Sequence, residues 1–166
     1  GLHWENKHVK LIGEPGAALT LGGGSTSHAV YLTWSGINRS DLISGFTFQN
    51  CQLNVNNCPE GYGPALTMKN GASPSIVNCS FEENQIQSLL YDLEFNNPIG
   101  FGGAVYIDGG INQTQSPYFS DCVFYNNNAG NANGGGAVAL FGPAEFRNCT
   151  FSWNWTTPCT GTVNAA

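Results

Sequence analysis

"EFRNCTFSWN", residues 145–154, decides the fold because its pattern recurs along the chain. The same arrangement stands at "SIVNCSFEEN" (75–84) and "YFSDCVFYNN" (118–127), and more loosely at "TFQNCQLNVN" (47–56). Aligned on the cysteine, it consists of an apolar residue, any residue, Asn or Asp, Cys, any residue, then Phe or Leu, with another Asn three residues later. The cysteines are 28, 43 and 27 residues apart. Repeats of roughly 20–50 residues are typical of solenoids, propellers and arrays.

A second phrase precedes each cysteine repeat. Its copies are "HAVYL" (28–32), "PALTM" (64–68), "GGAVYI" (102–107) and "GGAVAL" (135–140). Apolar residues alternate with polar ones within the phrases, which is the period of a β-strand. Gly, Asn, Ser and Pro between the phrases turn the chain. Each repeat is therefore interpreted as one coil of about three short strands, and successive coils stack in parallel sheets with like residues over like.

Stacking explains why the same residue types recur, because neighbouring strands place them ~4.8 Å apart. The core phenylalanines Phe81, Phe124 and Phe151 are predicted to form one stack. The residues before the cysteines are predicted to form an inward side-chain ladder that satisfies backbone groups of the turn. The ladder residues are Asn50, Asn78, Asp121 and Asn148. Parallel crossovers predict a right-handed solenoid.

The phrases "GGAV" and "FxxN" resemble the short repeats of the chlamydial polymorphic outer-membrane proteins and, more broadly, right-handed parallel β-helices of the pectate-lyase type. The resemblance covers residues 27–154, and "NKHVKLIGEPGAALTLGGG" (6–24) is similar to the first coil of many such helices. It implies an all-β, single-stranded, right-handed parallel β-helix of about five coils. The whole chain, 1–166, is expected to form one domain. Such families include adhesins, surface proteins, lyases and hydrolases, so the fold alone assigns no function.

The longest spacing between repeats predicts one insertion, around residues 84–98. Within "NQIQSLLYDLEF" (84–95), Ile86, Leu89, Leu90 and Leu93 have the spacing of an amphipathic helix. We expect a helical or looped element that docks on the solenoid wall. A partner-binding element is the alternative.

The six cysteines are an even number, which suits an oxidising compartment. Cys51 with Cys58, and Cys149 with Cys159, are close enough in sequence to form local disulfides. Cys79 and Cys122 are expected to be stacked neighbours, and their pairing is left open because their Cβ vectors run side by side. No CxxC spacing indicates a metal site, and neither a metal nor another cofactor is predicted.

Composition excludes two classes of partner. The net charge is −6, and Lys and Arg together number only five, a poor match for nucleic acid or an anionic membrane. No apolar run approaches the ~20 residues of a membrane span. Together with the cysteines, the Asn-x-Ser/Thr sequons favour a secreted protein. Asn38, Asn112 and Asn154 are the predicted glycan sites, whereas Asn78 and Asn148 are excluded as ladder residues.

An enzyme is the main rival interpretation. The resemblance to pectate lyases would imply clustered aspartates for calcium and an arginine base, but the aspartates are widely separated in sequence. They are Asp41, Asp92, Asp108 and Asp121. A glycosidase needs two carboxylates within about 5–10 Å. The histidines are expected on the surface or in loops; they are His3, His8 and His28. No catalytic residue is therefore predicted, and catalysis is disfavoured.

The sequence thus predicts a secreted, non-enzymatic structural glycoprotein at the cell surface. Its expected partner is itself, through end-to-end association into a filament or surface layer, because open coil edges template further strand pairing. One alternative is an adhesion or carbohydrate-binding module of a larger surface protein. The other is a polysaccharide lyase or glycoside hydrolase with an unrecognised site.

Overall fold

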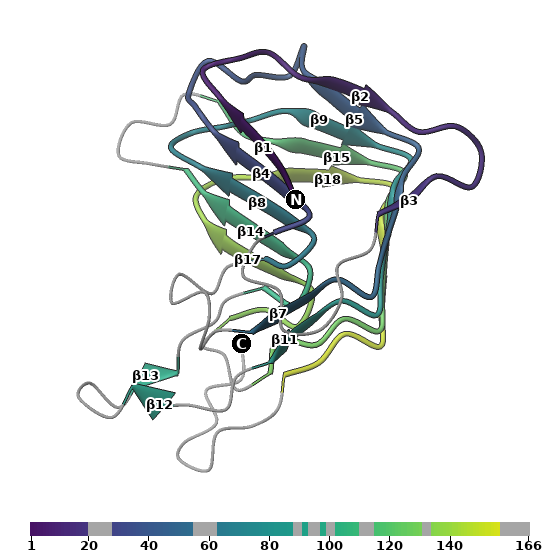
Figure 1. Ribbon diagram of the computed structural model, residues 1–166, viewed down its shortest axis with the longest axis vertical. Helices are drawn as coiled ribbons and strands as arrows, with labels where there is room; N and C mark the ends of the chain where they lie inside the picture. The colour runs from purple at the N-terminus through teal and green to yellow at the C-terminus, as the bar shows by residue number, and fades with distance from the viewer. Residues whose placement is uncertain are drawn as a thin grey trace.

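The computed structural model describes residues 1–19, 28–54, 63–87, 91–92, 97–98, 102–109, 115–130 and 134–156. The regular structure in these ranges is all β, with no helix. Most strands lie in three parallel sheets, each with five strands (Figure 1). We name these sheets A, B and C. The chain passes through them in that order and then returns to sheet A for its next pass. This architecture is consistent with a parallel β-solenoid.

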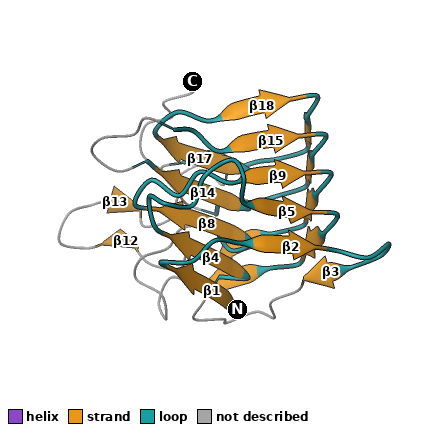
Figure 2. Cartoon of the chain, turned by 90° about the horizontal axis from the view of Figure 1, so that it is seen from above, coloured by secondary structure: helices purple, strands orange, loops and turns teal. Residues whose placement is uncertain are grey.

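The three sheets take their strands from the same successive passes of the chain (Figure 2). Sheet A contains β1 (Leu2–Glu5), β4 (Val30–Thr33), β8 (Leu66–Lys69), β14 (Val105–Asp108) and β17 (Val138–Phe141). Sheet B contains β2 (Lys10–Ile12), β5 (Leu42–Ser44), β9 (Ser75–Val77), β15 (Tyr118–Ser120) and β18 (Glu145–Arg147). Sheet C contains β3 (Ala18–Leu19), β6 (Thr47–Gln49), β10 (Ser80–Glu82), β16 (Val123–Tyr125) and β19 (Thr150–Ser152).

Two strand pairs stand outside these sheets. β7 (Gln52–Asn54) pairs in parallel with β11 (Gln85–Gln87), and β12 (Tyr91–Asp92) pairs antiparallel with β13 (Asn97–Pro98). The helical option for residues 84–95 is therefore wrong at its start, because Ile86 is buried in β11 opposite Leu53. Pairing with a neighbouring strand overrides the local helical spacing. Leu89, Leu90 and Leu93 lie outside the described residues.

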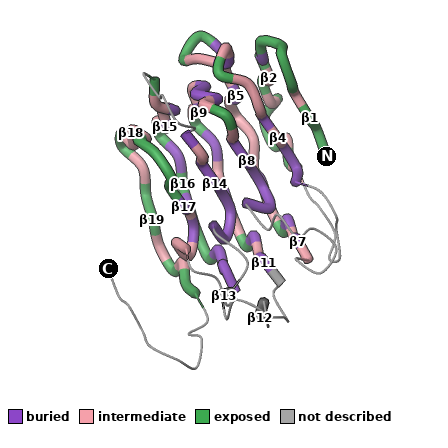
Figure 3. The backbone as a smooth tube through the Cα atoms, turned by 90° about the vertical axis from the view of Figure 1, so that its left-hand side faces the viewer, coloured by how far each residue is buried: buried purple, intermediate pink, exposed green. Residues whose placement is uncertain are grey.

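Aromatic rings fill the core in a continuous stack along sheet C. Phe48 and Phe81 stack with ring centroids 4.8 Å apart, and Phe81 and Phe124 are also 4.8 Å apart. Phe124 and Phe151 follow at 4.4 Å. The three inner rings are fully buried, whereas Phe151, in the last strand of the sheet, is 49% exposed. Figure 3 shows the same change from the buried central strands to the half-buried β18 and the largely exposed β19.

Two corners of each pass have left-handed backbone conformation. At the corner between sheets B and C, Gly45, Asn78, Asp121 and Asn148 have positive φ. At the corner after sheet C, the residues with positive φ are Asn50, Glu83, Asn126 and Trp153. Gly, Asn and Asp adopt this conformation most readily, which explains most of these residue types.

The left-handed corners correct the predicted ladder. Asn50, Asn78, Asp121 and Asn148 are exposed rather than inward, and they belong to two different corners. The Phe48–Phe81 pairing places Phe46, not Cys51, level with Cys79. Alignment on the cysteine therefore shifted the first repeat, because Cys51 belongs to a later position of the coil.

The inward ladder lies at the corner after sheet C, where Asn84, Asn127 and Asn154 each follow a residue with positive φ. The Nδ2 of Asn84 donates to Oδ1 of Asn127 at 2.9 Å, and the Nδ2 of Asn127 donates to Oδ1 of Asn154 at 2.8 Å. The same Nδ2 atoms donate to backbone carbonyls of the phenylalanine strand, Asn84 to Phe48 and Asn127 to Phe81. Cys51 takes the equivalent place one pass earlier, and its backbone N–H donates to Oδ1 of Asn84. Buried amides thus satisfy the corner's backbone groups, the role expected of the ladder.

The "GGAV" phrase occurs where the backbones of neighbouring passes of the chain approach each other closely. A Cβ on Gly103 would lie 1.9 Å from the carbonyl oxygen of Gly136, and a Cβ on Gly136 would lie 2.5 Å from the backbone nitrogen of Trp155. Only glycine leaves room for these backbone contacts. The recurrent Gly pair before sheet A is therefore required by packing.

Candidate functional site

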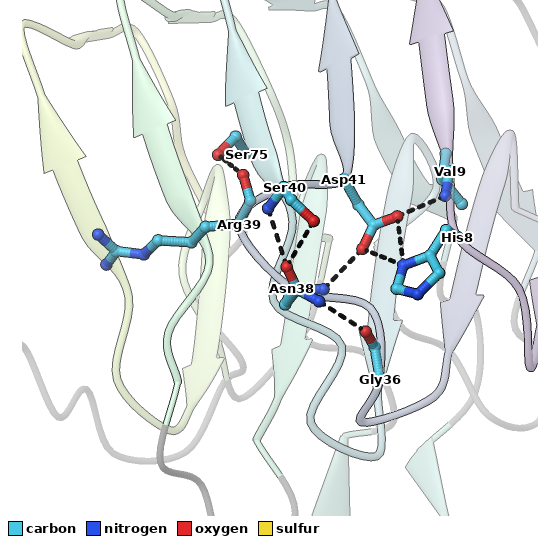
Figure 4. Close-up of polar contacts among 8 residues, drawn as sticks. All are labelled: His8, Val9, Gly36, Asn38, Arg39, Ser40, Asp41 and Ser75. Carbon is cyan, nitrogen blue, oxygen red and sulfur yellow. Dashed lines mark hydrogen bonds and ion pairs between the residues drawn. The ribbon is translucent and has the colours of Figure 1, made fainter.

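A buried carboxylate organises the loop between β4 and β5 (Figure 4). Nδ1 of His8 lies 3.0 Å from each carboxylate oxygen of Asp41. The backbone N–H of Val9 donates to Oδ1 of Asp41 at 2.6 Å, and the N–H of Asn38 donates to Oδ2 at 2.8 Å. Asp41 therefore joins the segment before β2 to the loop before β5.

The environment of Asp41 holds it in the charged form. Its side chain is only 2% exposed, and this burial acts to raise its pKa. The hydrogen bond from the N–H of Asn38, that from His8 and that from the N–H of Val9 outweigh burial, so the pKa lies below its usual value of 3.8. Hydrogen bonds to an ionised carboxylate stabilise that form. Asp41 is thus a satisfied buried anion.

The rest of the loop reinforces this arrangement. The Oδ1 of Asn38 accepts hydrogen bonds from the backbone N–H and the hydroxyl of Ser40, at 2.9 and 2.8 Å. Arg39 points away from Asp41 and runs along the outside of sheet B (Figure 4). Its guanidinium pairs with Glu145 at 2.8 Å and lies 5.3 Å from the centre of the Tyr118 ring. Together these contacts connect three passes of the chain.

A histidine held by a carboxylate is also part of many acid–base and nucleophilic sites. The side chain of His8 is 64% exposed, and its ring edge packs on Trp34 at 5.3 Å. Among the described residues, however, His8 hydrogen-bonds only to Asp41, so no hydroxyl or thiol nucleophile completes a triad there. We therefore interpret this cluster as a structural clamp.

The histidines lie on the surface or outside the strands, as expected, but two of them have specific partners. His8 is a loop residue that is paired with Asp41, and no motif or spacing in the sequence connects the two residues. His28 is buried rather than exposed, with Nδ1 3.0 Å from the carbonyl oxygen of Gly63. Over the described ranges, no group of three His, Cys, Asp or Glu side chains is placed to hold a metal ion. The same ranges contain no helix long and apolar enough to cross a bilayer.

Three of the described cysteines form a column of free thiols. Cys79, Cys122 and Cys149 follow one another on successive passes as free thiols, and Cys79 and Cys122 are buried. Burial raises the pKa of the Cys122 thiol to about 12, and the neighbouring Cys79 and Cys149 thiols act in the same direction. Cys58 and Cys159, the expected partners of Cys51 and Cys149, lie outside the described residues.

The corrected ladder changes which sequon asparagines are accessible to a glycan. Asn154 is the last ladder residue: its Nδ2 donates to the carbonyl of Phe124 and its Oδ1 accepts from Asn127, so its amide is committed to the protein. Asn78 and Asn148 are exposed, which removes the reason for excluding them as glycan sites. Asn38 is half-buried, and Asn112 lies outside the described residues.

The two ends of the stacked sheets form a second candidate site. Each sheet contains an inward-facing column of side chains that begins and ends with an apolar residue. At one end they are Trp4, Leu11 and Leu19, which are half-buried. At the other end they are Leu140, Phe146 and Phe151, of which Leu140 and Phe151 are exposed. Each end thus presents apolar side chains beside the outer edges of three strands.

Comparisons with models of protein families, with curated proteins and with solved structures find no match to this chain. The all-β architecture with parallel sheets is compatible with the parallel β-helix that the resemblance implies. No family match supports the particular repeats of the polymorphic outer-membrane proteins. Function must therefore be argued from the surfaces of this chain alone.

Proposed function

We propose that the protein is a secreted, non-enzymatic structural subunit that associates end to end into a filament or surface layer. In this proposal the fold is a right-handed parallel β-helix of five coils. The observation that supports this proposal most directly is that both ends of the stack present the edge strands of the same three sheets. Sheets A, B and C begin with β1, β2 and β3 and end with β17, β18 and β19. A second copy therefore offers three parallel strands to three parallel strands.

The apolar columns would continue across such a junction. Leu19 of one copy would lie over Phe151 of the next, in the place that the following phenylalanine takes inside the core. Leu11 would lie over Phe146 in the same way, and Trp4 over Leu140. Burial of these side chains, together with strand pairing along three edges, favours association. The contact joins two different surfaces and leaves one of each unused, so it propagates.

A pair of charge variants tests this junction. Phe151→Glu and Leu19→Lys should each give monomers in analytical ultracentrifugation, because each buries an unpaired charge at one end of the contact. A mixture of the two should associate again, since the unmodified Leu19 end of the Phe151→Glu variant fits the unmodified Phe151 end of the Leu19→Lys variant, and the Glu and Lys ends carry opposite charges. Tyr125→Glu, on the exposed flank of β16, is the control and should polymerise like the unmodified protein.

Polymers of the unmodified protein should also be visible as linear particles by negative-stain electron microscopy. A strictly monomeric unmodified protein at high concentration would refute the proposal. So would association that Phe151→Glu and Leu19→Lys leave unchanged while circular dichroism shows both to be folded.

A carbohydrate-binding module of a larger surface protein is the second candidate. One observation favours it: a polar groove with a tryptophan lies outside the asparagine ladder. This groove does not involve either apolar end column.

A further inference from the structure

The corner after sheet C carries a groove of about 310 Å³. This volume lies at the lower end of the roughly 300–1,000 Å³ range of small-molecule sites. Its lining residues are Asn50, Gln52, Glu83, Asn84, Gln85, Asn126, Asn128 and Trp155. Most of them are carboxamides, one is a carboxylate and one is an indole.

The groove follows from the geometry of the ladder. At this corner a residue with positive φ precedes the ladder position, and the residue that follows it also lines the groove; of these following residues Gln52 and Gln85 are half-buried, Asn128 is buried and Trp155 is exposed. The preceding residues form one column, in which Asn50, Glu83 and Asn126 line the groove. The following residues form a second column of Gln52, Gln85, Asn128 and Trp155, joined by the parallel pairing of β7 with β11 and by the bridges from Gln85 to Asn128 and from Asn128 to Trp155. Asn84 is buried between the two columns.

Several groove side chains retain unused hydrogen-bonding capacity. Within the described part of the chain, the side chains of Asn50, Glu83, Gln85 and Asn126 make no hydrogen bond to protein. Asn84, in contrast, is fully engaged in the ladder. A carboxamide presents a donor and an acceptor side by side, which matches the paired hydroxyls of a sugar.

Two further features narrow the ligand class. The indole of Trp155 is 50% exposed at one end of the groove, where it offers a flat apolar face with a polar edge. Glu83 is the single charged residue among the eight lining residues, so the groove has no cation to receive a carboxylate, sulfate or phosphate. The repeat of about 4.8 Å between carboxamides of one column is also close to the length of one ring in an extended sugar chain.

The backbone conformation of Glu83 is a further feature of the groove. Its φ is 54°, a conformation in which Asn or Gly is favoured; Asn occupies the equivalent positions 50 and 126, and Trp153 occupies the last one, outside the groove. Residues held in such a conformation cluster at functional sites. The carboxylate at this position is therefore not explained by the turn itself.

We propose that this groove binds a neutral, hydroxyl-rich oligosaccharide, with the carboxamide columns contacting hydroxyl groups and Trp155 stacking on one ring. The inference deepens the second candidate function and is independent of end-to-end association. A bound linear oligosaccharide would lie along the stacking axis, across two to three passes of the chain.

Isothermal titration calorimetry of the full chain tests the proposal with a panel of neutral oligosaccharides, comprising β-glucans, mannan and xylan fragments, and with oligogalacturonate as the acidic comparison. At least one neutral sugar should bind, and oligogalacturonate should bind more weakly than it. Trp155→Ala and Gln85→Ala should each weaken binding by about tenfold or more, as loss of a central contact does. Trp153→Asn is the matched control, because Trp153 is 79% exposed at the same corner but does not line the groove.

Ultracentrifugation of the same variants separates the two proposals, since Trp155→Ala should leave polymerisation intact. Binding of no neutral sugar at millimolar concentration by folded protein would overturn the assignment of the groove. Preference for oligogalacturonate, or affinity unchanged in both Trp155→Ala and Gln85→Ala, would overturn it as well.

Discussion

Replacement of Phe124 by alanine tests how far the phenylalanine stack stabilises the fold. The ring is fully buried and is stacked on Phe81 at 4.8 Å and on Phe151 at 4.4 Å. It also packs against Phe119, with ring centroids 6.0 Å apart. Parallel strands on both sides prevent the site from collapsing, so a cavity remains in the variant. Truncation of a large buried aromatic side chain costs roughly 3–5 kcal/mol, and the upper half of this range is expected here.

Two companion variants calibrate the measurement. Phe151 is in the same stack but half-exposed, so Phe151→Ala should lower the free energy of unfolding by only about 1–2 kcal/mol. Tyr125 follows Phe124 in β16 and is exposed, so Tyr125→Ala should change the free energy by no more than about 0.5 kcal/mol. Urea denaturation followed by circular dichroism, at a concentration where the protein is monomeric, supplies all three values.

The ordering of the three variants is the critical result. A loss below about 1 kcal/mol for Phe124→Ala would mean that the stack does not carry the core. Equal decreases in the free energy of unfolding for Phe124→Ala and Phe151→Ala would show that the Phe151 ring is buried in solution. The half-exposed position of Phe151 would then be wrong.

Two pH-dependent predictions concern buried titratable groups. Asp41→Asn should lower the free energy of unfolding by about 1–3 kcal/mol near neutral pH, because the hydrogen bonds around a buried carboxylate lose their acceptor charge. Folding lowers the pKa of Asp41, so its contribution to stability is present above pH 3.8 and is lost as the pH falls through the pKa of the folded state. Urea denaturation between neutral and acid pH should therefore show a free energy of unfolding that depends less on pH in Asp41→Asn than in the exposed control Glu5→Gln. Cys122 has the opposite sign: its thiol pKa rises from 9.0 to about 12, so its contribution is full below 9 and lost as the pH rises toward 12. The loss of stability over that alkaline range should be smaller in Cys122→Val than in the unmodified protein, and equal slopes would contradict this assignment.

The sequence predicts the strands and the aromatic stack because both depend on a short period and on one residue type. Phe81, Phe124 and Phe151 each stand two residues after a cysteine, and strand pairing places them in register. Parallel stacking then follows from the repeat itself. Such patterns survive small errors of alignment at other positions, since the apolar face is fixed by the alternation of the strand.

Alignment on cysteine misplaces the ladder because two positions of the coil carry cysteine. Cys79 faces the core after the corner between sheets B and C, whereas Cys51 stands in the ladder position after sheet C. The cysteine is therefore an unreliable reference position for aligning the repeats. The turn preference of Asn and Asp was the better signal, since Asn78 and Asp121 have positive φ and side chains at such corners point outward.

The pair of His8 and Asp41 was missed for a different reason. The two residues are 33 positions apart in the sequence and their pairing is found in one coil only, so no repeat and no local spacing connects them. Only the stacking of one pass on the next brings the segment before β2 against the loop before β5. A repeat predicts what its copies share, and the contacts that are particular to one coil have to be taken from the three-dimensional arrangement.

The corner after sheet C shows how one structural device can generate both stability and a binding surface. An inward amide at a ladder position leaves the residues on either side of it to line the groove. Where the chain places polar residues at both flanks, as around Asn84 and Asn127, a groove with two rows of hydrogen-bonding groups results. Around Asn154 the flanks are tryptophans instead, and Trp155 ends the groove with an apolar surface. The buried ladder therefore fixes the spacing of the outer rows, so that a ligand meets groups positioned by the core rather than by a mobile loop.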